Sequence, residues 1–310
     1  MIEAMVMRVS GGSSGQPMSS DAGYHYRFTA MTVPCEIILF ADTAELLAVA
    51  IENNTRRLEA KYNFHDKCSW LSQQINARQV NKVQLDDETA GILASVRQYC
   101  IATDGVFDIT IGSLKYQQAS QSTLSREQLY LSIAPYMGLS NWSIDGNWLN
   151  FYHYQTRFDL GGVIKECAVD QAVELAKAAG ITGVLINFGG DIRTFGHKPD
   201  GSEFIVAVVN PKDSQKPFFS LPLNNQALTT SAHYQRGYQF SDGQTSHILS
   251  KGGVHPQILS STVVADTALE AGIYSTALTI NPTLDVPESV GFALIDDKLT
   301  LHQDVEFIQL

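Results

Sequence analysis

The residues best suited to chemistry lie between Phe158 and Gly196. An Asp-Leu-Gly-Gly turn at residues 159–162 places the Asp159 carboxylate beside a glycine backbone that a ligand can approach closely. An amphipathic helix follows directly, and its first backbone N–H groups point toward the same turn. Helix N-termini favour phosphate, so this turn is a candidate phosphate site.

A second polar corner follows an apolar strand farther along the same segment. It consists of Asn187, Gly189, Gly190 and Asp191. The two glycine-rich corners flank one helix of about fourteen residues, roughly 21 Å long at 1.5 Å per residue. We therefore expect residues 158–196 to form the floor of a ligand cleft.

The elements that must position these corners can be expected from local patterns. Asp42 and Glu45 form a capping box for a helix that runs to about Tyr62. A second helix is expected from Asp86 to about residue 102, and residues 63–80 and 120–150 are expected to be loop and periphery. Further expected elements are strands at 204–209, 218–223, 228–231, 291–296 and 305–310 and a helix at 267–278. Helices and strands mix without strict alternation, which predicts an α+β fold.

Length, charge and cysteine usage restrict the classes of protein. The 310 residues suit one large unit, and the net charge of -11 argues against a nucleic-acid surface. No run approaches the roughly 18 apolar residues that a membrane span requires. The four cysteines lie far apart and are expected to be reduced core thiols.

The N-terminal residues have a different composition from the rest of the chain. Residues 1–21 are rich in Gly and Ser and predict a flexible tail, which leaves residues 22–310 as one domain. This tail has no apolar signal region and no lipobox-like cysteine. The sequence as given therefore predicts a cytoplasmic protein, or a periplasmic one if an export signal precedes it.

Several ordered motifs resemble one known family. The strongest are the Asp-Leu-Gly-Gly-x-x-Lys-x-x-Ala-x-Asp run at 159–170, the Asn-x-Gly-Gly-Asp-x-Arg corner at 187–193 and a Thr-Asp-Gly-x-Phe-Asp-x-Thr-x-Gly-x-Leu block at 103–114. Weaker matches lie at residues 30–36, 58–76, 227–231, 246–249 and 265–278. Together they resemble the ApbE family of FAD:protein FMN transferases over most of the chain from Phe28 onward.

The resemblance implies a reaction, a cofactor and a partner. It implies cleavage of the FAD pyrophosphate and transfer of FMN to a Thr or Ser of an acceptor flavoprotein, with Mg²⁺ stabilising the charge. It also implies a single domain with mixed sheets and flanking helices around a flavin cleft. The implied FAD site contains Met31, Val106, Phe107, Asp108, Asp159, Lys165 and Ile248. The implied metal ligands are the Gly162 carbonyl and the Thr276 hydroxyl, with Ser275 as a further candidate, and no catalytic residue is assigned.

The chain departs from the family pattern at the metal site. Gly272 stands where the family has a metal-binding Asp, four residues before Thr276, and Glu166 stands where the family has Gly after the motif Lys. Asp266 could replace the lost ligand, although six residues on a helix place it nearly opposite. The sequence thus predicts Mg²⁺ binding that is weak or depends on FAD. An alternative function follows, in which the protein binds FAD or a partner without FMN transfer.

Each candidate site residue also has a purely structural explanation. Asp159 and Asp191 could satisfy N–H groups of their own turns. Thr276 could hydrogen-bond a carbonyl of its own helix. Phe107 could be an ordinary core residue, and Lys165 could be a solvated residue of the first helical turn.

Overall fold

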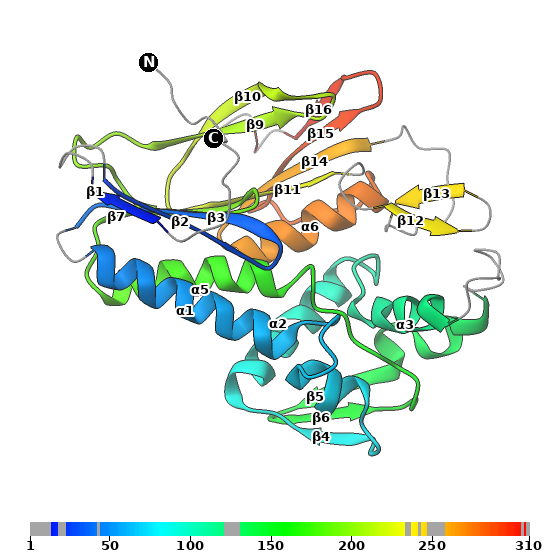
Figure 1. Cartoon of the computed structure of the whole chain (residues 1–310). Coiled ribbons are helices and arrows are strands. Elements are labelled where there is room, and N and C mark those ends of the chain that lie inside the picture. Colours follow the sequence, from blue (N-terminus) through cyan, green and yellow to red (C-terminus); the bar gives the residue numbers. More distant parts are fainter. Residues whose placement is uncertain are drawn as a thin grey trace.

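A nine-stranded sheet forms the centre of the molecule (Figure 1). The computed structural model describes residues 14–17, 23–41, 44–120, 131–232, 237–240, 243–246, 258–304 and 307. The strand order is β1-β2-β3-β7-β8-β11-β14-β15-β16, and neighbouring strands are antiparallel. The strands are β1 Ser14–Pro17, β2 Tyr24–Ala30, β3 Val33–Leu39, β7 Gly183–Phe188, β8 Asp191–Gly196, β11 Ala227–Ala232, β14 Ile258–Ala265, β15 Gly291–Asp296 and β16 Leu301–Gln303.

Three helices cover one face of this sheet, and a two-stranded ribbon covers the other (Figure 1). The helices are α1 Ala44–Tyr62, α5 Ile164–Ala178 and α6 Ala268–Ile280, and the ribbon pairs β9 Phe204–Asn210 with β10 Asp213–Leu223. The ribbon buries Val206 and Leu223 in a cluster with Ile192 and Val264 of the large sheet. Strand β14, which both layers cover, is buried on both sides, whereas β2 and β3 alternate between buried and more exposed residues.

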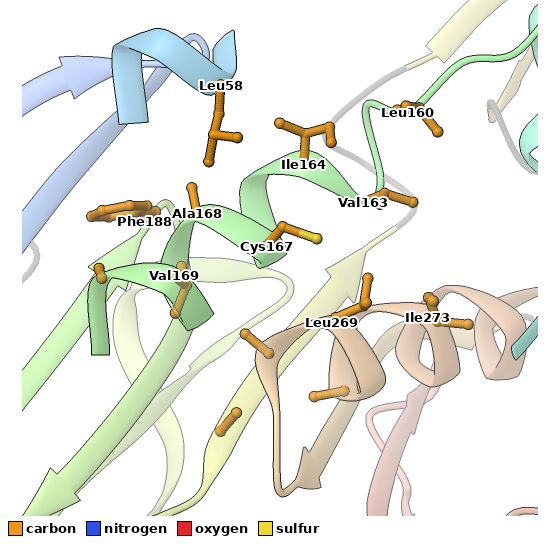
Figure 2. Close-up of a cluster of buried hydrophobic side chains, with 14 of the residues drawn as sticks. Leu58, Leu160, Val163, Ile164, Cys167, Ala168, Val169, Phe188, Leu269 and Ile273 are labelled. Carbon is orange, nitrogen blue, oxygen red and sulfur yellow. The ribbon is translucent and has the colours of Figure 1, made fainter. Parts of the chain in front are cut away.

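Helix α5 lies between α1 and α6 and packs on both. Its buried residues include Ala168, Val169, Ala172 and Val173, which lie on two sides of the helix. Figure 2 shows this helix between Leu58 of α1 and Leu269 and Ile273 of α6. Burial of one Val, Leu or Ile side chain contributes about 1.5–3 kcal/mol, so this contact fixes α5 firmly.

A smaller lobe packs below α1 and α5 (Figure 1). It contains α2 Asp87–Ala102, α3 Gly112–Ser120, the π-helix Leu71–Asn76 and the sheet β4-β6-β5, formed by Lys82–Gln84, Trp148–Phe151 and Trp142–Asp145. Short 3₁₀ turns lie at Ile109–Ile111, Ala134–Tyr136 and Leu139–Asn141. Trp142 is 0% exposed and contacts Phe158 edge-on at 5.0 Å between ring centroids. The expectation that residues 120–150 are peripheral is therefore wrong at Trp142.

Most expected elements are confirmed, with differences at the ends of the chain. Asp86 caps α2 through a hydrogen bond from Thr89 N–H, and Thr267 caps α6. Strand β1 (Ser14–Pro17) pairs with β2, although it lies in the segment expected to be a flexible tail. The remaining residues of that segment, 1–13 and 18–21, lie outside the described ranges. Among the described residues the last strand is β16 Leu301–Gln303. The expected strand at 305–310 lies outside the described residues apart from residue 307. A hairpin pairs β12 Gly237–Phe240 with β13 Gly243–Ser246.

Two further expectations concern the state of the cysteines and the presence of membrane-spanning helices. Cys35, Cys100 and Cys167 are buried free thiols, as expected, whereas Cys68 is free but exposed. Burial raises the pKa of the Cys35 and Cys100 thiols to about 12. None of the helices within the described ranges has the length and apolar character needed to cross a membrane.

Candidate functional site

The backbone at the start of the Asp-Leu-Gly-Gly turn is held from three directions. The Asn76 side chain donates to Phe158 O at 2.9 Å and accepts from Phe158 N–H at 2.8 Å, as a neighbouring strand would. Asp159 N–H donates to Ile109 O at 2.8 Å. A Cβ at Gly112 would lie 2.6 Å from the Phe158 carbonyl carbon, so only glycine allows this approach. The motif residues at 103–114 therefore position the turn.

Asp159 has two partners in this turn. Its Oδ1 accepts a hydrogen bond from Gly161 N–H at 2.8 Å, and its Oδ2 forms an ion pair with Lys115. The carboxylate is 7% exposed, whereas the Lys115 side chain reaches the surface. Asp159 thus acts as a turn residue and also holds a cation beside the glycines. Sequence reasoning missed Lys115, whose signal was its position directly after the motif Leu114.

The motif aromatic residue lies beside the same turn. Phe107 is buried in the main core, and a Cβ at Gly162 would lie 3.8 Å from its ring. Val106 packs against this core. Asp108 accepts hydrogen bonds from Thr110 N–H at 2.8 Å and from its hydroxyl at 2.6 Å. The structure therefore brings Phe107 to the turn, while the Asp108 carboxylate caps a 3₁₀ turn.

The second corner packs against the hairpin that joins β2 and β3. Asn187 Oδ1 accepts from Gly190 N–H at 2.9 Å. Gly189 has φ 63°, and a Cβ there would lie 2.7 Å from Val33 Cβ. Both constraints require glycine at position 189, which explains its place in the motif.

Met31 lies in the two-residue turn between β2 and β3. Met31 and Thr32 have φ of 51° and 64°, which is the geometry of a type I′ hairpin turn. Met31 N–H donates to Glu59 Oε1 at 2.7 Å. Glycine adopts this left-handed conformation most readily, so Thr32 holds a strained backbone here.

Three charged residues meet where α5 begins. Lys165 Nζ lies 2.6 Å from Asp191 Oδ2, so Lys165 is paired with the second corner and is not a solvated residue. Glu166, the next residue, is 5% exposed, and its Oε2 receives no hydrogen bond from the described residues. Burial, and then repulsion from Asp191, raises the pKa of Glu166, while Lys165 opposes this shift.

Two further motif residues fasten α6 to α5 and the sheet. Asp170 accepts from Ala268 N–H at 2.8 Å and from Leu269 N–H at 3.0 Å, and Arg193 Nη1 lies 3.1 Å from its Oδ1. A carboxylate at a helix N-terminus stabilises the helix through its free N–H groups and its dipole. These two motif residues thus set the position of α6.

The expected metal ligands of α6 lie in a cluster of hydroxyls. Ser231 Oγ on β11 lies 2.9 Å from Ser275 Oγ and 3.3 Å from Thr276 Oγ1. Ser275 Oγ also donates to Gly272 O at 3.0 Å. Such hydroxyl oxygens are hard donors that suit Mg²⁺. Thr276 is partly exposed and Ser275 is buried, so Thr276 is the more accessible of the two.

Two limits apply to the metal and flavin residues. Among the described residues, no three His, Cys, Asp or Glu side chains converge as a metal cluster. Ile248 lies outside the described residues, so its expected place in the FAD site stays a prediction.

Comparison with known proteins identifies the family. The model of the ApbE family matches residues 31–291. The chain belongs to the ApbE family. It is 26% identical to the FAD:protein FMN transferase of Escherichia coli K12 over 70% of this chain and 65% of that protein, so the match spans slightly less than two thirds of that relative. It is 24% identical to the Haemophilus influenzae FAD:protein FMN transferase over 81% of this chain and 78% of that protein.

Solved ApbE structures share the fold. The ApbE protein of Thermotoga maritima superposes with a TM-score of 0.81 at 24% identity, covering 93% of this chain and 98% of that one. The flavin transferase ApbE of Vibrio cholerae superposes with a TM-score of 0.76 at 18% identity, covering 96% of this chain and all of that one. The expected α+β architecture with flanking helices in a single domain is thereby confirmed. The sheets were expected to be mixed, but all strand pairs among the described residues are antiparallel.

Proposed function

We propose that this chain is an FAD:protein FMN transferase that modifies a Thr or Ser of an acceptor flavoprotein and uses Mg²⁺. One observation carries the proposal. The turn at 159–162 is clamped by Asn76 and Gly112 and runs directly into α5, whose first turns pack on α6 near Ser275 and Thr276. The curated relatives with this family pattern are named FAD:protein FMN transferases.

The proposed FAD site surrounds this turn. Helix α5 begins at Ile164 with no side-chain cap, which leaves its N-terminal dipole for a pyrophosphate. Lys115 and Lys165 add positive charge on either side of the turn. The proposed lining residues remain Met31, Val106, Phe107, Asp108, Asp159, Lys165 and Ile248.

The proposed reaction is an in-line displacement at the FMN phosphorus of FAD. The oxygen of the acceptor hydroxyl forms a bond to this phosphorus, and its proton passes to solvent. The bond between the phosphorus and the bridging oxygen breaks, and AMP leaves with the electron pair. The chain's part is to position the pyrophosphate and to stabilise its charge with fixed cations and N–H groups.

The residues present fit a hard cation beside this pyrophosphate. The Gly162 carbonyl and the hydroxyls of Thr276 and Ser275 are the proposed oxygen donors, and they suit the preference of Mg²⁺ for hard ligands. When bound, Mg²⁺ supplies positive charge to the phosphoryl oxygens. Ser231 supports both hydroxyls from β11.

Gly272 favours a second candidate function, in which the chain binds FAD or a partner protein without transferring FMN. A missing acidic ligand on α6 would weaken charge stabilisation while leaving the turn at 159–162 intact. Such a protein would be yellow after purification with FAD and would release no AMP.

The two functions are separated by measuring AMP release from FAD with Mg²⁺, with and without an acceptor domain. A transferase releases AMP in step with the acceptor supplied, and EDTA stops the release. The control is an acceptor whose target hydroxyl residue is replaced by Ala. Flavin binding without acceptor-dependent AMP would refute the transferase proposal and support the second function.

A further inference from the structure

The two departures from the family pattern at the metal site face one another in space. A Cβ built at Gly272 on α6 would lie 2.6 Å from Cγ of Glu166 on α5, and 3.2 Å from both its Cδ and its Oε1. The extra side chain at 166 therefore occupies the space that an Asp at 272 would need. The side chain missing from one helix is present on the other.

We propose that Glu166 supplies, from α5, the acidic Mg²⁺ ligand that the family pattern places at position 272 on α6. The proposal rests on the proposed function, because it concerns the metal of that same site. It assigns a metal ligand at a position where the family pattern has Gly and therefore has no side chain.

The Glu166 carboxylate lies on the side of α6 that carries the proposed hydroxyl ligand. Residues 272 and 276 are one helical turn apart, so their Cβ positions lie about 5–6 Å from each other on one face of α6. The Glu166 carboxylate carbon and its Oε1 each lie 3.2 Å from the Cβ position of residue 272. The Thr276 hydroxyl belongs to the same face of α6. Two oxygens that each lie about 2.1 Å from one Mg²⁺ are at most about 4.2 Å apart, so the side chains of Glu166 and Thr276 must bring their oxygens closer together than these Cβ positions are.

The Glu166 carboxyl interacts with Asp191 and with its own backbone N–H, and its Oε2 is the oxygen that could accept a cation. It is nine-tenths buried or more, and its Oε2 receives no hydrogen bond from the described residues. Burial of a carboxylate oxygen without a partner is costly, and a bound cation removes that cost. Its neighbour Asp191 is already paired with Lys165 at 2.6 Å.

Other carboxylates of the two helices have different positions or tasks. Asp170 holds the N-terminus of α6 together with Arg193. Glu174 is exposed and bonds Lys177. Asp266, the substitute considered from the sequence, is exposed and precedes the first residue of α6. Glu166 is thus the carboxylate on α5 that reaches position 272.

The test is calorimetric titration of the whole chain with Mg²⁺, first without nucleotide and then with ADP, whose pyrophosphate stands in for that of FAD. Glu166→Gln keeps the shape and removes the charge. We expect it to lower Mg²⁺ affinity on the order of 10- to 100-fold. Glu174→Gln makes the same change on the same helix away from the site and should bind as the unmodified chain does. The double variant E166G/G272D moves the carboxylate to α6 and should restore binding.

The outcomes separate this inference from the proposed function. Unchanged Mg²⁺ affinity in Glu166→Gln, or a double variant that fails to restore it, overturns the ligand role. If the unmodified chain transfers FMN while Glu166→Gln binds Mg²⁺ normally, only the ligand role fails. If Mg²⁺ binds through Glu166 but no FMN is transferred, only the proposed function fails.

Discussion

The contact between Glu166 and Gly272 predicts strongly coupled effects on stability. Gly272→Asp alone would place a Cβ 2.6 Å from Glu166 Cγ, well inside van der Waals distance. Glu166 is buried, so its side chain has little room to move away. Overpacking of a buried site costs about 1–3 kcal/mol. A second carboxylate at this position adds repulsion, because like charges at close range disfavour the ionised forms.

The same contact predicts that the two changes together are tolerated. Glu166→Gly alone leaves a void and an interior helical glycine, which costs about 1 kcal/mol from the backbone alone. In E166G/G272D the new Asp fills the space that Glu166 vacates. We therefore expect the double variant to be more stable than the sum of the single effects by about 2 kcal/mol, within the range for residues in contact.

The measurement is urea unfolding followed by circular dichroism, with EDTA present so that metal binding does not contribute. All four proteins of the cycle are compared at one pH and one protein concentration. Glu174→Gln serves as the control and should change stability by less than about 0.5 kcal/mol. Additive effects, with a coupling near zero, would refute the close approach of the two helices at this point.

Three further predictions follow from single contacts. Asp159→Asn keeps the acceptor for Gly161 N–H but loses the ion pair with Lys115. Fluorescence quenching should therefore show FAD binding that is about tenfold weaker. If the variant unfolds instead, Asp159 has a purely structural role. Thr32→Gly relieves φ 64° and should stabilise the protein by about 0.5–1 kcal/mol in thermal unfolding, and no gain would contradict this. Asp170→Asn should lower the free energy of unfolding in urea by about 3 kcal/mol, because it breaks a buried ion pair and a helix cap. A smaller loss of stability than that caused by Glu174→Gln would contradict this prediction.

Local patterns were sufficient for elements whose stability is mainly local. The helix expected from Asp86 to about residue 102 is α2 Asp87–Ala102, and the structure shows Asp86 to be its N-cap. The expected strands match β9 to within one residue and β15 at both ends, whereas β10 begins five residues before the expected start at 218. The π-helix Leu71–Asn76 was expected to be a loop, because its polar residues hide the few apolar positions that pack inward.

The site depended more on contacts between distant segments. The sequence predicted that Gly272 lacks a ligand, but position 166 lies on another helix more than 100 residues earlier. Only the packing of α5 on α6 shows that Glu166 fills that space. Lys115 was missed for the same reason, since its partner Asp159 is 44 residues away. The burial of Trp142 likewise arises from its contact with Phe158 and not from any local pattern.

The structure also gives separate tasks to residues of one motif. In the run from Asp159 to Asp170, the first carboxylate shapes a turn and holds Lys115, whereas the last caps α6. Lys165 between them pairs with Asp191 of the second corner. The motif therefore combines the ligand turn with the scaffold that orients α6 against it.

The most direct test of the central claim is intact-mass analysis of an acceptor domain after incubation with this chain, FAD and Mg²⁺. The account predicts that each acceptor gains the mass of one FMN less one water. An acceptor whose target Thr or Ser is replaced by Ala should gain nothing. An unmodified acceptor mass in the complete mixture, from a chain that binds FAD, would contradict the assignment as an FMN transferase.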